Sequence, residues 1–136
     1  MIVTTEVVMP KLTVDQQVVD VPAGTRLVLA LEDAGIAIGH RCGGFARCTT
    51  CRVAVVHGEP TTMTQAEFAK LRERELYGSY RLACQIVCEH DMQVQPIMTR
   101  KNQDWTDTGP RPEPTVTPEA RWYPIDELER GQTAGA

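Results

Sequence analysis

Four cysteines constrain this chain more than any other feature of its sequence. Three of them, Cys42, Cys48 and Cys51, lie in one short glycine-containing stretch, and Cys84 follows thirty-three residues after the third. Closely spaced thiolates are soft ligands that select zinc or iron–sulfur clusters over hard cations. A zinc ribbon has two separated Cys-x2–4-Cys pairs, whereas here one loop supplies three sulfurs. The spacing therefore predicts a loop that wraps around a group larger than one metal ion.

The spacing Cys-x5-Cys-x2-Cys…Cys and the opening Cys42-Gly43-Gly44 resemble the [2Fe–2S] ferredoxin family, whose plant-type members have four residues between the first two cysteines. The five-residue spacing is similar to that of the adrenodoxin and bacterial cluster-assembly branch, although Arg52 stands where that branch usually has histidine. Residues 47–53 are more similar to a bacterial group, some of whose members are fused to signalling domains. The resemblance covers residues 1–98.

The resemblance implies that Cys42, Cys48, Cys51 and Cys84 bind a [2Fe–2S] cluster, with the first two on one iron and the last two on the other. Such a cluster carries one electron and makes no bond to a substrate, so we expect an electron-transfer protein and not an enzyme. It would accept electrons from a ferredoxin reductase (a flavoprotein) and pass them to an oxygenase, a cytochrome P450 or a biosynthetic enzyme. A redox-sensing or regulatory module acting through a partner protein is the alternative, and a structural zinc protein is a third hypothesis.

Composition limits the compartment and the partners. No apolar run reaches about 18 residues, so no membrane span is predicted, and the first residues lack the layout of a signal peptide. Five cysteines without an export signal favour a reducing compartment, which predicts a cytoplasmic protein. The net charge of −4, without a basic stripe, argues against nucleic-acid binding. We expect a monomer.

Hydrophobic periodicity predicts alternating strands and helices. Valine-rich segments flank residues 10–13, which predicts a hairpin with its loop there, and apolar side chains then recur at helical spacing as far as Gly35. Thr64 and Glu67 fit a capping box, in which each side chain satisfies a free backbone donor. The expected elements are strands at 2–9 and 14–21, a helix from 25 to 35, a strand at 52–57, a helix from 64 to about 76, and a strand at 92–96.

This order of elements is that of the β-grasp (ubiquitin-like) fold of the α+β class, and the resemblance implies parallel pairing of its first and last strands. We therefore expect a [2Fe–2S] ferredoxin domain at residues 1–98. Residues 99–136 form a Pro-rich C-terminal extension that holds both tryptophans, Trp105 and Trp122. An extension that folds back on the domain is favoured over a disordered or partner-docking tail, because disordered segments seldom collect aromatic residues. A short helical turn is expected at 124–130.

Several polar residues adjoin the cysteines, and the sequence leaves their roles open. Arginines held against a cluster would raise its reduction potential, whereas exposed arginines would shape partner docking. Thr49 and Thr50 are either donors to sulfur or small loop residues. Cys88 is expected to be a buried thiol rather than a ligand or sensor. His40, His57 and His90 are expected to be ordinary surface or loop residues. The four arginines concerned are Arg41, Arg47, Arg52 and Arg81.

Overall fold

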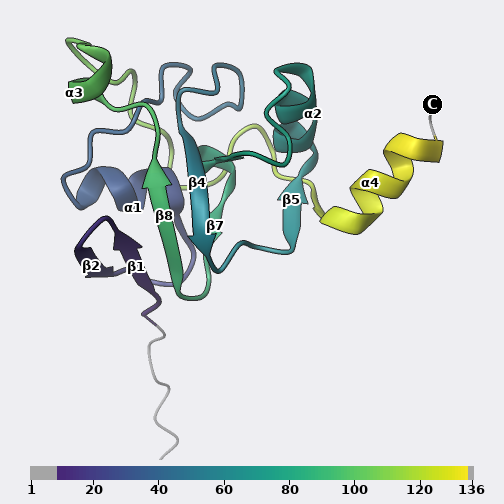
Figure 1. Ribbon diagram of the computed structural model, residues 1–136, viewed down its shortest axis with the longest axis horizontal. Helices are drawn as coiled ribbons and strands as arrows, with labels where there is room; N and C mark the ends of the chain where they lie inside the picture. Colours follow the sequence, from purple (N-terminus) through teal and green to yellow (C-terminus); the bar gives the residue numbers. More distant parts are fainter. Residues whose placement is uncertain (1–8, 135–136) are drawn as a thin grey trace, which may run out of the picture.

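A five-stranded mixed sheet forms the centre of the molecule, in the order β2-β1-β8-β4-β6 (Figure 1). The computed structural model describes residues 9–134, so most of the strand expected at 2–9 lies outside the described residues. β1 pairs in parallel with β8, and the other neighbours are antiparallel. The α+β class and the parallel pairing are thus confirmed. The strands are β1 (Lys11–Val14), β2 (Gln17–Asp20), β4 (Arg52–His57), β6 (Arg81–Leu82) and β8 (Met92–Pro96).

The first hairpin lies further along the chain than its valines predict. Residues 11–13, expected to be part of a loop, form β1 together with Val14, and the turn falls at Asp15, whose φ of 54° is left-handed. Aspartate adopts this conformation more readily than most residues. Leu12 and Val14 are each 2% exposed and belong to the core. The predicted loop was wrong because burial of these two side chains outweighs the turn signal of Pro10.

α1 (Leu27–Asp33) supplies the largest helical share of the core, as its apolar stripe predicts. Leu27 and Leu31 are completely buried and join strand residues such as Val53 in one cluster. The chain leaves the helix through Gly35, whose φ of 89° is readily adopted only by glycine. The exit from α1 therefore leads the chain into the cysteine loop, defined here as residues 42–51.

α2 (Gln65–Glu73) begins with half of the predicted capping box. The Thr64 hydroxyl accepts a hydrogen bond from the Glu67 N–H at 3.1 Å, as expected. The Glu67 carboxylate does not complete the box, because it binds Arg81 and the Leu82 N–H instead. Phe68 and Leu71 face inward as predicted, and residues 72–75 are exposed.

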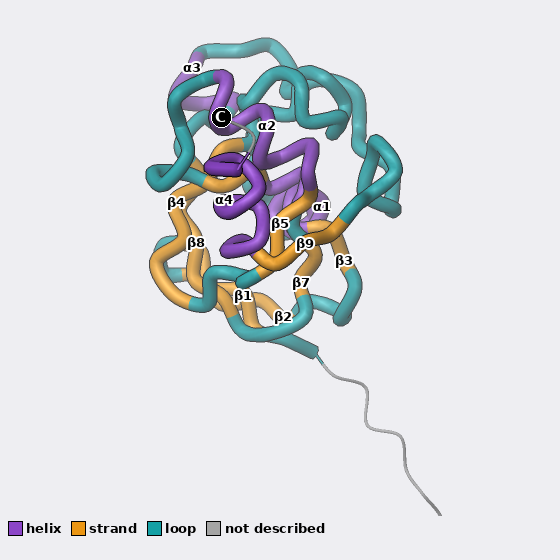
Figure 2. The backbone as a smooth tube through the Cα atoms, turned by 90° about the vertical axis from the view of Figure 1, so that its right-hand side faces the viewer, coloured by secondary structure: helices purple, strands orange, loops and turns teal. Residues whose placement is uncertain are grey.

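Short elements complete the fold, and several of them were not expected. β5 (Thr62–Thr64) pairs with β9 (Trp122–Pro124), which leads into α4 (Ile125–Ala134) on the side of the molecule where α2 lies (Figures 1 and 2). The helical turn expected at 124–130 is therefore the first part of a longer helix. The division of the chain at residue 98 stays a prediction. The remaining elements are β3 (Thr25–Arg26), β7 (Val87–Cys88), the 3-10 turn η1 (Ala83–Gln85) and α3 (Arg100–Gln103).

None of the helices within residues 9–134 combines the length and the apolar character needed to cross a membrane.

Candidate metal centre

The four cysteines named from the sequence lie together as two adjoining pairs. The Cys42 N–H points at the Cys48 sulfur at 3.4 Å, and the Cys84 N–H points at the Cys51 sulfur at 3.5 Å. Cys48 and Cys51 also interact electrostatically, so the pairs are neighbours. Among residues 9–134, no three histidine, cysteine or acidic side chains surround a single metal position. Two thiol pairs would fit a two-iron group with two sulfurs on each iron, and Cys42 lies beside Cys48 as Cys51 lies beside Cys84. The assignment of these four cysteines as ligands stays a prediction.

Strand pairing explains why the distant Cys84 arrives beside the loop. Cys51 directly precedes β4, and Cys84 follows β6 in the turn η1. β4 and β6 pair with Arg52 opposite Leu82, and the Ala83 N–H donates to the Cys51 carbonyl at 3.1 Å. The sheet register therefore fixes the fourth sulfur against the third.

Donors from the loop converge on the sulfurs. The N–H groups of Phe45 and Arg47 point at the Cys42 sulfur at 3.3 and 3.5 Å. Gly43 and Gly44 have φ values of 75° and 90°, which allow the loop to curl in this way. Such donors stabilise negative charge on sulfur and on anything the sulfurs hold.

Hydrogen bonding within each pair shifts the pKa values of its two cysteines in opposite directions. The hydrogen bond from Cys48 lowers the pKa of Cys42 to about 4, and the same hydrogen bond raises the pKa of Cys48. The hydrogen bond from Cys51 likewise lowers the pKa of Cys84, while that of Cys51 is raised. Thiolates are the form of cysteine that binds metal, so the sulfur environment suits a metal group.

The two threonines of the loop have different roles. Thr50 Oγ1 accepts from the Arg41 N–H at 3.1 Å and shares a hydrogen bond with the Cys48 sulfur at 3.0 Å. Thr49 donates to the Cys48 carbonyl and accepts from Arg52, so it shapes the loop.

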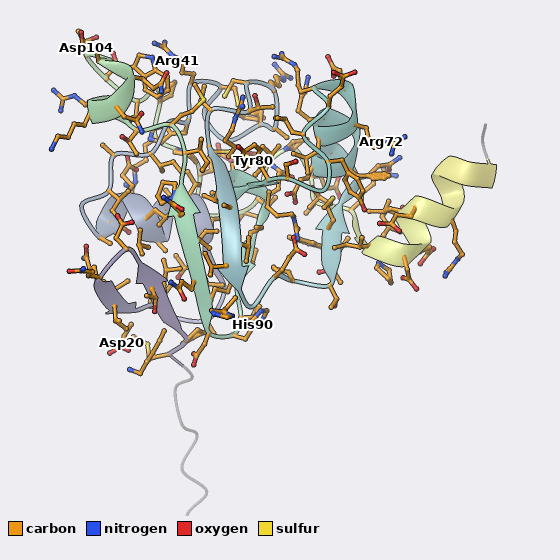
Figure 3. The ribbon with its side chains drawn as sticks, viewed as in Figure 1. Asp20, Arg41, Arg72, Tyr80, His90 and Asp104 are labelled. Atoms are coloured by element: carbon orange, nitrogen blue, oxygen red, sulfur yellow. The ribbon has the colours of Figure 1, made fainter. Side chains whose placement is uncertain are left out.

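The four arginines near the cysteines are not equivalent. Arg81 is 3% exposed and its charge is neutralised by Glu67, since its Nε lies 2.7 Å from Oε2 of that completely buried carboxylate. Arg41 and Arg47 are exposed, and Arg41 stacks over Trp105 near α3 (Figure 3). Arg52 is half-buried. These other three arginines therefore lie at or near the surface of the loop.

A fifth arginine, Arg26, was missed by the sequence analysis. Its side chain is completely buried, and its guanidinium donates to the carbonyls of Cys84 and Gly44 on either side of the centre. Desolvation lowers the pKa of Arg26, against the attraction of the Cys84 and Cys51 sulfurs. No local pattern in the sequence marks Arg26, because the carbonyls that bind it belong to residues distant along the chain.

Residues 108–117, which we call the strap, run along the cysteine loop. Pro112 is buried, and a side chain at Gly44 would come within 2.9 Å of its Cβ. The Thr117 hydroxyl donates to the Gly44 carbonyl at 3.1 Å, and Gln85 donates to the Thr117 carbonyl at 2.7 Å. The strap therefore restricts access of water to this side of the centre.

Two other candidates are buried beside the site. Cys88 is 2% exposed, and burial raises the pKa of its thiol to about 12, which fits an inert core residue. His40 lies in a loop, one of the two placements expected for it, but it is buried there with 1% of its surface exposed. Its Nε2 lies 2.9 Å from Glu32 Oε1 and 3.1 Å from the Thr108 hydroxyl, which ties the strap to α1.

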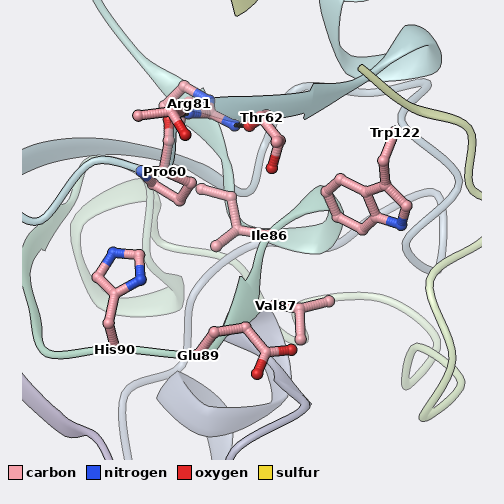
Figure 4. Close-up of a pocket in the computed structure, with 9 residues that line it drawn as sticks. Pro60, Thr62, Arg81, Ile86, Val87, Glu89, His90 and Trp122 are labelled. Atoms are coloured by element: carbon pink, nitrogen blue, oxygen red, sulfur yellow. Dashed lines mark hydrogen bonds between the residues drawn. The ribbon is translucent and has the colours of Figure 1, made fainter. Parts of the chain in front are cut away.

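A separate cavity of about 350 Å³ lies between β9 and residues 86–90 (Figure 4). Trp122, His90 and Glu89 contribute to its lining. None of the cysteines lines it, so the cavity is not part of the metal centre.

Comparison with known proteins identifies the same region. Residues 12–89, 78 of the chain's 136, match the family described as the 2Fe-2S iron-sulfur cluster binding domain. The chain is 39% identical over 77 residues to one subunit of the Na(+)-translocating NADH-quinone reductase of Chlamydia felis, and 34% identical over 80 residues to the same subunit from Haemophilus influenzae. These matches cover 55% and 59% of this chain but only 17% and 19% of the relatives. The chain thus matches under a fifth of their length.

Solved structures give the same fold. An ISC-like [2Fe-2S] ferredoxin from Pseudomonas putida superposes with a TM-score of 0.54 at 25% identity, covering 65% of this chain and 93% of that one. A reductive activator for a corrinoid, iron-sulfur protein gives a TM-score of 0.54 at 34% identity, covering 65% of this chain and 14% of that one. The β-grasp ferredoxin fold expected from the sequence is confirmed.

Proposed function

Because this chain belongs to the family of 2Fe-2S iron-sulfur cluster binding domains, we propose that it is a one-electron carrier whose cluster is held by Cys42, Cys48, Cys51 and Cys84. Its cofactor is a [2Fe–2S] cluster, and its chemistry is electron transfer. The cluster supplies a site that gains and loses one electron without a bond to substrate. The protein supplies the thiolates, the donors around them and the surface that partners approach.

The arrangement of the cysteines in two pairs carries this proposal. Each pair offers two sulfurs to one iron, and backbone N–H groups from the loop are already directed at Cys42 and Cys48. Donors aimed at sulfur stabilise the more negative, reduced state of a cluster. This arrangement favours redox chemistry over a purely structural metal, for which a single tetrahedral position would suffice.

Electron exchange is proposed to occur at the outer side of the cysteine loop. Cys42 and Cys48 are half-buried and Phe45 beside them is 37% exposed, whereas Cys51 and Cys84 are at most 3% exposed. The exposed pair is therefore the shorter route for an electron. Arg41 and Arg47 flank this surface, so a partner with an acidic patch is favoured there.

We propose a flavoprotein reductase as donor and an oxygenase, cytochrome P450 or biosynthetic enzyme as acceptor, with the chain itself acting as a cytoplasmic carrier and not as an enzyme. A second candidate is the electron-transfer module of a larger reductase. This second function is favoured by the relatives, which are reductase subunits more than five times longer than the matched segment.

Rapid reaction kinetics test the carrier function. The chain is reconstituted anaerobically, mixed with a flavoprotein ferredoxin reductase and its nicotinamide, and followed by cluster absorbance. A carrier is reduced quickly and reoxidised by an added acceptor protein over many cycles. Slow exchange combined with redox-dependent binding to a partner would replace this function by the regulatory one. Exchange only within a covalent or tight reductase complex would favour the module.

The reduction potential is expected to lie above the value of about −400 mV typical of plant-type ferredoxins. A positive charge about 8 Å from the added electron stabilises it by about 2 kcal/mol at an effective dielectric constant of about 20. For a one-electron couple this corresponds to about 90 mV for each charge held near the centre. Protein-film voltammetry on the reconstituted chain measures the potential directly. A value at or below that of the plant proteins would contradict the expectation.

A further inference from the structure

Arg26 is a buried cation whose guanidinium donates five hydrogen bonds to backbone carbonyl groups. Nε and Nη2 donate to the Cys84 carbonyl at 3.1 and 2.6 Å, and Nη2 also donates to the Gly44 carbonyl at 2.8 Å. Nη1 donates to the carbonyls of Glu113 and Thr115 at 2.7 and 3.2 Å. These five bonds use all five N–H groups of a guanidinium, so its orientation is fixed.

No carboxylate of residues 9–134 lies within ion-pair distance of Arg26. The Glu113 carboxylate, which is exposed, attracts it only from further away. Arg81 shows the opposite arrangement, because the buried Glu67 compensates its charge. Burying an uncompensated charge is costly, so a buried arginine requires an anion nearby.

The sulfur centre is the anion that the structure offers. Arg26 bonds to the carbonyl of Cys84 and interacts electrostatically with both Cys84 and Cys51, the buried pair. Its charge therefore lies beside the buried pair of sulfurs, Cys51 and Cys84. Little water separates the two charges there, because Arg26, Cys51 and Cys84 are at most 3% exposed.

We propose that Arg26 is a positioning residue that sets the reduction potential of the centre, by holding one unscreened positive charge against its buried side and clamping the strap to the cysteine loop. This inference rests on the ligation proposed above. The electron comes from the reductase or an electrode, no bond changes, and the fixed charge of Arg26 stabilises the extra negative charge. Surface arginines do the same only weakly, because water and salt screen them.

The electrostatic role and a merely structural role predict shifts of opposite sign. Loss of the positive charge lowers the potential, since the reduced state loses its stabilisation. Loosening of the strap without loss of charge admits water, which favours the more highly charged reduced state and raises the potential. The sign of the shift therefore separates the two roles.

The test compares Arg26→Gln, Arg26→Lys and Arg47→Gln in cluster-loaded protein by voltammetry. Arg26→Gln is expected to lower the reduced fraction at a fixed electrode potential at least about tenfold, which is about 59 mV for a one-electron couple. Arg26→Lys retains the charge and is expected to keep more than half of that difference. Arg47→Gln, which removes an exposed charge beside Cys48, is expected to shift the potential less.

An unchanged or raised potential in Arg26→Gln, or equal shifts in the glutamine and lysine variants, would overturn the proposal. Iron and sulfide analysis of the wild-type chain distinguishes failure of the Arg26 proposal from failure of the proposed ligation. If the ligation proposal fails, the wild-type chain holds no cluster; if only the Arg26 proposal fails, the wild-type chain still holds one.

The wild-type protein offers a second test if Arg26→Gln does not load a cluster. Raising the salt concentration from about 0.01 to about 1 M shortens the Debye length from about 30 to about 3 Å, which removes the influence of exposed charges. A potential set by buried Arg26 is expected to change little. A potential that falls steeply with salt would assign the effect to surface arginines and contradict the proposal.

Discussion

Replacing Cys84 with serine is expected to remove the cluster. Changing a residue that only supports a metal ligand lowers metal affinity roughly 10- to 100-fold, and we expect the loss of a ligand to lower iron affinity by more than this. A serine hydroxyl is a hard, protonated ligand at neutral pH and binds iron poorly compared with a thiolate. Cys84 is also 1% exposed and paired with Cys51, so another side chain of the loop is not expected to take its place. Visible absorption and iron analysis after anaerobic reconstitution measure the loss.

Cys88→Ser is the matched control, because Cys88 is similarly buried and only four residues further along the chain. Cys88 lies in β7, paired with Thr25 of β3. Its replacement buries a hydroxyl group, which we expect to lower the free energy of unfolding by about 1–3 kcal/mol. The absorption spectrum of the cluster is expected to stay the same. A Cys84→Ser protein with wild-type iron content would show that Cys84 is not a ligand. Loss of the cluster in Cys88→Ser would point to Cys88 instead.

Breaking the ion pair between Glu67 and Arg81 is expected to have the largest effect on folding. Glu67→Gln removes the buried charge opposite Arg81. Among residues 9–134, the exposed Glu59 at 3.9 Å is then the one carboxylate left near Arg81. Removing one partner of a buried pair typically costs about 3–5 kcal/mol. Glu67 is completely buried, and its carboxylate also accepts from the Leu82 N–H at 2.8 Å, two residues before Cys84. The free energy of unfolding in urea, measured on the cluster-free chain, gives the change without a contribution from iron.

Glu73→Gln on the same helix controls for the loss of charge alone. Glu73 is exposed and pairs with Lys70 at 2.9 Å, an arrangement that contributes little in water. No measurable change in unfolding free energy is expected for it. Equal stability of the Glu67→Gln and Glu73→Gln proteins would contradict the role assigned to the buried pair.

The convergence of the four cysteines was predictable because the chemistry of an iron–sulfur cluster favours both the residue type and the spacing. Such clusters are held mainly by thiolates, and a loop that places three of them around one group leaves the pattern of Cys42, Cys48 and Cys51 visible in the sequence. That these cysteines are ligands stays a prediction. α1 was predictable for a similar reason, since its buried face requires apolar residues at helical spacing.

Contacts between distant residues were not predictable from local pattern. Glu67 fitted a capping box with Thr64, but its carboxylate binds Arg81, 14 residues away, because a buried arginine needs an anion. Arg26 reaches the carbonyls of Glu113 and Thr115, 87 and 89 residues away, and neither carbonyl has a signature in the sequence. The hairpin moved for the same reason, since Leu12 and Val14 are placed by the core they enter.

Coulometric titration of the reconstituted full chain, with iron and acid-labile sulfide measured on the same sample, tests the central claim most directly. The account predicts two irons and two sulfides per chain and reversible uptake of one electron per cluster. A colourless protein that contains only zinc and takes up no electron would contradict it.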